Sequence, residues 1–164
     1  MGIELIALDL DGTLVDSAPD LCHCLGVALE TVGLPAPSEP QTRGWVGGGI
    51  ELLLRRALVH AAGPPAVGDD GVLPAALAAF SACYERNLYV RSRLYEGVAT
   101  ALGELGARGI PLYCITNKRL EFAEGLLGFF SGKLSPPNTA AKCSRMPACS
   151  SSPSANSSRL LVMQ

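Results

Sequence analysis

A short apolar strand that ends in two carboxylates is the feature that most constrains this chain. Residues 3–8 place large apolar side chains on both alternating faces, which predicts a strand buried on both sides, as in a parallel sheet. Asp9 and Asp11 follow directly, and Gly12 lets the backbone turn sharply. Because ligands of open α/β sheets bind beyond the carboxyl ends of the strands, we expect a functional site here.

Two carboxylates at this spacing suit phosphoryl transfer. An ionised carboxylate attacks phosphorus and forms an acyl phosphate, and a second carboxylate protonates the leaving oxygen and later deprotonates water. Close negative charges that face a phosphate need a cation, and hard oxygen ligands suit Mg²⁺. The alternative interpretation is a strand followed by an ordinary Asp-Gly turn.

A second buried strand is predicted over residues 110–115, and Thr116 and Asn117 stand at its end. A hydroxyl beside backbone N–H groups at the start of a helix forms a cradle for phosphate. Helix capping explains the same residues equally well. The next helix is expected over residues 119–130.

Residues 17–91 contain no strand-like run, and their apolar residues recur at spacings of three and four. This pattern predicts an all-helical cap inserted after the first catalytic loop. We therefore expect an α/β fold with a Rossmann-like parallel sheet, in which residues 1–16 and 92–130 form a partial core.

Composition excludes several classes of function. The net charge is −2, the pI is about 5.7 and aromatic residues make up 5% of the chain, so neither nucleic acid nor a membrane surface is an expected partner. The six cysteines include no Cys-x-x-Cys pair, which argues against a zinc ribbon or a thioredoxin-type site. With no signal peptide or membrane span in the sequence, the cytoplasm is the expected location.

The run from Asp9 to Ser17 resembles the first motif of the haloacid dehalogenase-like phosphatases, and Thr116 with Asn117 is similar to their second motif. Within that family the chain is most similar to the phosphoglycolate phosphatases, over residues 1 to about 128. The resemblance implies that Asp9 is the nucleophile and a Mg²⁺ ligand. It also implies that Asp11 is the general acid and base and binds Mg²⁺ through its main-chain carbonyl, and that Thr116 and Asn117 bind phosphate.

The implied reaction is Mg²⁺-dependent hydrolysis of a small phosphomonoester through an aspartyl-phosphate intermediate. The expected substrate is 2-phosphoglycolate. Two alternatives stay open: a catalytically incomplete fragment of such a phosphatase, and a related phosphomutase. The sequence does not predict an oligomeric state.

The resemblance stops near residue 130. The family's lysine, usually beside a proline, and its late acidic motif have no recognisable counterpart, and no Asp or Glu follows Glu124. Lys133 and Lys142 are candidates for the lysine, but neither lies in the expected context. The Ser- and Pro-rich composition of residues 131–164 predicts disorder. Our hypothesis is a truncated or frame-shifted end, which would leave two core strands and a marginally stable or aggregating chain.

Overall fold

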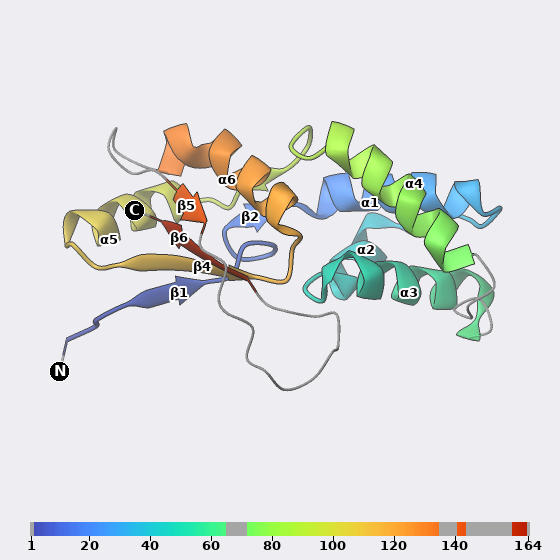
Figure 1. Cartoon of the computed structure of the whole chain (residues 1–164), viewed down its shortest axis with the longest axis horizontal. Helices are drawn as coiled ribbons and strands as arrows, with labels where there is room; N and C mark the ends of the chain where they lie inside the picture. The colour runs from blue at the N-terminus through green and yellow to red at the C-terminus, as the bar shows by residue number, and fades with distance from the viewer. Residues whose placement is uncertain (1, 65–71, 135–140, 144–158, 164) are drawn as a thin grey trace. The chain divides into compact units, whose positions relative to one another are not determined.

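A computed structural model of the chain describes residues 2–64, 72–134, 141–143 and 159–163, with side chains described as far as residue 130. The chain divides into two compact units. One comprises Met1–Asp16 and Arg93–Gln164, and the other comprises Ser17–Ser92. The boundary predicted from the sequence lies at residues 16/17 and 91/92. We call these parts the core unit and the insert unit and describe each by itself (Figure 1).

The core unit contains a strand at each of the two predicted positions. The first is shorter than predicted, because only residues 6–8 form it, and these residues are half-buried or exposed rather than buried on both faces. Strand β1 (Ile6–Leu8) pairs in parallel with β4 (Leu112–Thr116). The register places Ile6 opposite Leu112 and Leu8 opposite Cys114, so the carboxyl ends of both strands lie at the same edge of the sheet. The parallel arrangement is the Rossmann-like feature predicted for this part of the chain.

The sheet contains two further described strands. Strand β6 (Arg159–Met163) runs antiparallel to β4, and β5 (Ala141–Cys143) runs antiparallel to β6, which gives the strand order β1-β4-β6-β5. The structure here differs from the expectation of a disordered tail. The apolar run that ends at Met163 has the length of a strand, and the second edge of β4 offers it backbone hydrogen-bonding groups. For residues 135–140, 144–158 and 164 the same expectation lies outside the described residues.

Two helices flank strand β4 in the sequence of the core unit. Helix α5 (Val98–Ala107) precedes β4, helix α6 (Leu120–Leu134) follows it, and the two helices contact each other. On β4, Cys114 and Thr116 are buried whereas Ile115 is exposed. One face of this strand is therefore packed, and the opposite face, with Tyr113 half-buried and Ile115 exposed, is more accessible to solvent.

A small antiparallel ladder, which the sequence analysis did not anticipate, joins the two chain segments of the core unit that flank the insert. Strand β2 (Val15–Asp16) pairs with β3 (Arg93–Leu94). A further backbone bond of 3.2 Å runs from the Tyr95 N–H to the Leu14 carbonyl. The points at which the chain leaves and re-enters the core unit are therefore neighbours.

Among the described residues of the insert unit, every regular element is a helix, and loops connect the helices. It contains α1 (Ala18–Thr31), α2 (Glu39–Trp45), α3 (Gly49–Ala62) and α4 (Val72–Arg86). The apolar positions predicted from helical spacing form its interior, and buried members include Leu21, Leu25, Leu29, Leu54, Leu58, Phe80 and Tyr84. Burying each large apolar side chain contributes roughly 1.5–3 kcal/mol before the entropy cost is subtracted.

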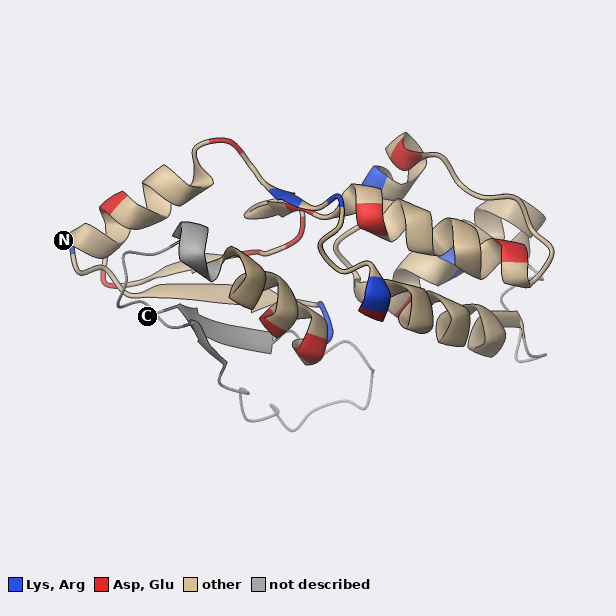
Figure 2. Ribbon diagram, turned by 90° about the horizontal axis from the view of Figure 1, so that it is seen from above, with Lys and Arg blue, Asp and Glu red and all other residues tan. Residues whose placement is uncertain are grey.

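The helix ends of the insert unit carry residues that commonly cap helices. Ser38 and Gln41 form a capping box at the start of α2, which satisfies backbone groups that the helix cannot pair itself. Gly33, with a φ of 74°, follows the end of α1. Charges of both signs lie along these helices (Figure 2), and the pairs Arg43–Glu39 and Arg55–Glu51 are spaced four residues apart.

Candidate active site

The loop after β1 is closed tightly by its own backbone. Leu10, which is fully buried, accepts hydrogen bonds from the N–H groups of Leu14 and Val15 at 3.0 and 2.9 Å. The Gly12 N–H donates to the Val15 carbonyl at 2.9 Å, and Gly12 has a φ of 81°, a conformation that favours glycine. This turn fixes the backbone on both sides of Asp11.

Asp9 stands at the carboxyl end of β1. The N–H of Leu10 donates to Asp9 Oδ1 at 2.7 Å and so orients the carboxylate. The pKa of this carboxyl is raised above its ordinary value, chiefly by partial burial and to a smaller extent by the charge of Asp11. The hydrogen bond from Leu10 and the charge of Lys118 lower the pKa, but they do not cancel the rise.

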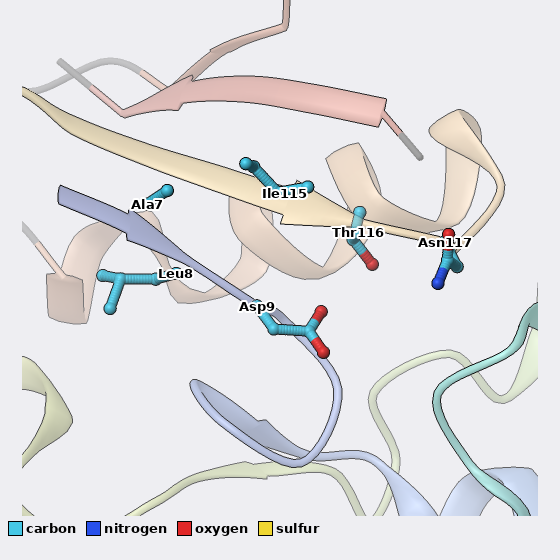
Figure 3. Close-up of a pocket in the computed structure, with 6 residues that line it drawn as sticks. All are labelled: Ala7, Leu8, Asp9, Ile115, Thr116 and Asn117. Carbon is cyan, nitrogen blue, oxygen red and sulfur yellow. The ribbon is translucent and has the colours of Figure 1, made fainter. Parts of the chain in front are cut away.

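A pocket of about 250 Å³ lies where β1 and β4 end, and its lining residues are Ala7, Leu8, Asp9, Ile115, Thr116 and Asn117. Figure 3 shows the Asp9 carboxylate and the Thr116 hydroxyl pointing toward the same gap between the two strand ends. Three of the four predicted site residues, Asp9, Thr116 and Asn117, are thus brought together. The parallel register of β1 and β4 accounts for this, because it aligns strand ends that are far apart in sequence.

Thr116 is buried, with 3% of its surface exposed, and Asn117 is exposed. The backbone N–H of Lys118 donates to Thr116 Oγ1 at 3.2 Å. Helix α6 begins at Leu120, soon after these residues. A hydroxyl and an amide side chain therefore precede a helix start, as the phosphate-cradle interpretation requires.

Asp11, the fourth predicted residue, does not line this pocket. Its carboxylate oxygens Oδ1 and Oδ2 lie 3.0 and 3.1 Å from Lys118 Nζ. Only 3% of the Lys118 side chain and 14% of the Asp11 side chain are exposed. The structure thus brings a lysine into the site that the sequence analysis missed. The available signal was its position two residues after Thr116, at the end of a predicted strand.

The residues present are compatible with a magnesium ion that keeps part of its water shell. Within the described part of the chain no group of three or more His, Cys, Asp and Glu side chains is placed to hold a metal. Mg²⁺, however, commonly binds through one or two carboxylates, several waters and a substrate phosphate. The Asp9 carboxylate, which lines the pocket, and the main-chain carbonyl of Asp11 would be its protein ligands. The side chains of Lys133 and Lys142 lie outside the described residues.

One further structural feature concerns membranes. Among the residues that the structure describes, no helix is both long enough and apolar enough to cross a bilayer.

Sequence comparison finds curated relatives that are named phosphoglycolate phosphatase. Over 125 residues the chain is 42% identical to a phosphoglycolate phosphatase of Nitrosococcus oceani, an alignment that covers 76% of this chain and 54% of the relative. It is 39% identical over 135 residues to a phosphoglycolate phosphatase of Vibrio cholerae, covering 79% of this chain and 60% of the relative. The chain therefore spans little more than half the length of these curated relatives.

Structural comparison gives a consistent result. A crystal structure described as a predicted phosphoglycolate phosphatase from Haemophilus somnus 129PT matches with a TM-score of 0.73 and 35% identity, over 80% of this chain and 59% of that protein. The family model of the haloacid dehalogenase-like hydrolases matches residues 3–144. The resemblance carried by the Asp9 and Thr116 motifs is thereby confirmed, and the chain belongs to the haloacid dehalogenase-like hydrolases.

Proposed function

We propose that this chain acts as a Mg²⁺-dependent phosphoric monoester hydrolase in which Asp9 accepts the phosphoryl group of a small phosphomonoester. The observation that carries the proposal is the pocket shared by the Asp9 carboxylate and the Thr116 hydroxyl at the ends of β1 and β4. The names of the relatives favour 2-phosphoglycolate as the substrate. The expected location stays the cytoplasm.

In the first step an oxygen of Asp9 forms a bond to phosphorus while the bond from phosphorus to the ester oxygen breaks. Because Oδ1 accepts the Leu10 N–H, we assign the attack to Oδ2. Asp11, in its protonated form, gives a proton to the departing alkoxide. The products of this step are the free alcohol and an aspartyl phosphate on Asp9.

In the second step Asp11 removes a proton from a water molecule whose oxygen attacks phosphorus. The bond between phosphorus and Asp9 breaks, inorganic phosphate forms and the Asp9 carboxylate is restored. Throughout, the Thr116 hydroxyl and the Asn117 amide donate hydrogen bonds to the phosphoryl oxygens. A bound Mg²⁺ supplies positive charge that offsets the repulsion between the carboxylates and the phosphate.

A second candidate is binding of phosphate without turnover. It is favoured by the lack, within the described residues, of a third side chain placed to complete a metal site. On this alternative, the pocket around Thr116 would hold inorganic phosphate and Asp9 would transfer nothing.

The test measures phosphate release from 2-phosphoglycolate by the full chain, with Mg²⁺ and with excess chelator. The proposed function predicts release that needs Mg²⁺ and falls to background in Asp9→Asn. A matched control is Glu4→Gln, which removes an exposed carboxylate from the segment just before β1 and should keep wild-type turnover. Calorimetric titration with inorganic phosphate identifies the second candidate, which predicts binding by a chain that releases none. Turnover retained by Asp9→Asn would remove Asp9 from the role of nucleophile.

A further inference from the structure

The ion pair between Lys118 and Asp11 links the two loops that carry the proposed catalytic residues. Lys118 Nζ lies within 3.0–3.1 Å of both carboxylate oxygens of Asp11, across 107 positions of sequence. Lysine is rarely buried unless it is paired, and here 4% of the residue is exposed. The pair with Asp11 therefore accounts for the burial of Lys118 in the core unit.

The backbone of Lys118 is held as well as its side chain. Its N–H donates to Thr116 Oγ1 at 3.2 Å, so the residue is tied to the hydroxyl that lines the pocket. Through Lys118, the end of β4 is connected to the turn that follows β1. A displacement of Lys118 would consequently disturb Asp11 and Thr116 together.

Stability alone is a weak reason for such a pair. Removing two charges from water costs several kcal/mol, and their mutual attraction often does no more than offset that cost. What the pair does fix is orientation, because an ammonium within hydrogen-bonding distance of both oxygens holds the carboxylate in one place.

We infer that Lys118 is the positioning residue for Asp11, holding its carboxylate where proton exchange with the leaving group and with water takes place. This inference rests on the proposed function, because Asp11 is the group that moves the proton in that reaction. Lys118 is not one of the residues that line the pocket, so we assign it no contact with the phosphoryl group. Its loss should therefore lower kcat far more than it changes KM.

The experiment compares Lys118→Met, Lys118→Arg and wild type, each as the full chain, with 2-phosphoglycolate and Mg²⁺. We expect Lys118→Met to lower kcat by roughly 10–100-fold, by analogy with the loss of residues that orient metal ligands, and to change KM less than about threefold. Lys118→Arg keeps the positive charge and should restore much of kcat. The matched control is Arg119→Met, which removes the neighbouring exposed cation, paired with Glu121, and should keep wild-type kcat.

Folding of each variant is checked by thermal unfolding, together with Asp11→Asn and the double variant Lys118→Met/Asp11→Asn. We expect the double variant to lose less melting temperature than the sum of the two single losses, because each single change leaves one buried charge behind. Additive losses would overturn the ion pair as the means of positioning.

The two proposals fail in different ways. If wild type shows no Asp9-dependent turnover, the proposed function fails and this inference falls with it. If wild type turns over and a folded Lys118→Met keeps its kcat, only the role of Lys118 is overturned. If Lys118→Met loses kcat and Lys118→Arg recovers none of it, the charge of Lys118 is not what positions Asp11, and the inference is also overturned.

Discussion

The buried carboxylate of Asp20 accepts hydrogen bonds from both the hydroxyl and the backbone N–H of Ser92, at 2.7 and 2.8 Å. Arg91 adds its own N–H at 2.9 Å to Asp20 Oδ1. Asp20 lies in the first turn of α1, and Ser92 is the last residue of the insert unit. One side chain with 1% of its surface exposed therefore joins the beginning and the end of that unit.

Replacing Asp20 by Ala should destabilise the insert unit. The change removes the acceptor of two backbone N–H groups, and leaving one such buried group without an acceptor costs about 1–3 kcal/mol. Urea denaturation followed by far-ultraviolet circular dichroism measures the loss. Glu51→Ala is the control, because its ion pair with Arg55 is exposed and should be worth less than about 1 kcal/mol. Equal effects of the two changes would contradict a special role for Asp20.

The raised pKa of Asp9 predicts that the stability of the chain depends on pH. Its pKa is raised in the folded chain above the ordinary value of 3.8, chiefly by burial, so the folded state binds this proton more tightly than the unfolded state does. Stability from this group therefore falls as the pH rises from 3.8 through the raised pKa and stays lower above it. Asp9→Asn keeps an oxygen for the Leu10 N–H and removes the charge. We expect its melting temperature to exceed that of wild type at neutral pH and the difference to shrink toward pH 3.8; a variant that is less stable at every pH would refute this.

The cysteines of the insert unit should differ in reactivity. Burial, aided by a hydrogen bond with Cys83, raises the pKa of the Cys24 thiol, whereas Cys22 is half-buried. Because the thiolate is the reactive form, Cys22 should react with a disulfide reagent about tenfold or more faster than Cys24. Peptide mass spectrometry in a Cys143→Ser/Cys149→Ser background measures both rates. In urea the two rates should converge, and similar rates in buffer would speak against the burial of Cys24.

We expect the exposed apolar side chains just before β1 to promote aggregation. Strand β1 is at one edge of the four-stranded sheet, and Leu5 just before it is 50% exposed. Such edges pair readily with other chains, and a lysine opposes that pairing. Leu5→Lys should slow aggregation measured by light scattering and leave the melting temperature close to that of wild type. Val59→Lys on α3, which replaces another exposed apolar residue, is the control and should not slow it.

Many of the helices and strands could be predicted, because their patterns depend only on residues that are close together in the sequence. A short apolar run marked the strand that ends at Thr116, and helical spacing marked the buried face that includes Leu25 and Leu29. Asp9 and Thr116 could be placed together because parallel strands share an edge for their carboxyl ends. Each of these inferences needed only the residues of one element and one general rule of sheet topology.

The features that were missed depend on contacts between distant segments. The position of Lys118 two residues after Thr116 places it near the site, but it does not reveal that its ammonium meets Asp11. The pairing of Val15 with Leu94 was likewise hidden, because strands of two residues leave no periodic pattern. The strand that ends at Met163 was misjudged from composition, since a polar segment around a short apolar run does not reveal that an edge is available to it.

The ladder of β2 and β3 has a consequence for how such a chain diversifies. Because Asp16 lies opposite Arg93, the two points of the core unit to which the insert is attached are neighbours. A segment whose two attachment points adjoin can be exchanged for one of another length, or excised and replaced by a tight turn, without shifting the strands on either side. The architecture is therefore suited to transplantation, in which the Asp9 motif stays in place while a foreign module is grafted between Asp16 and Arg93.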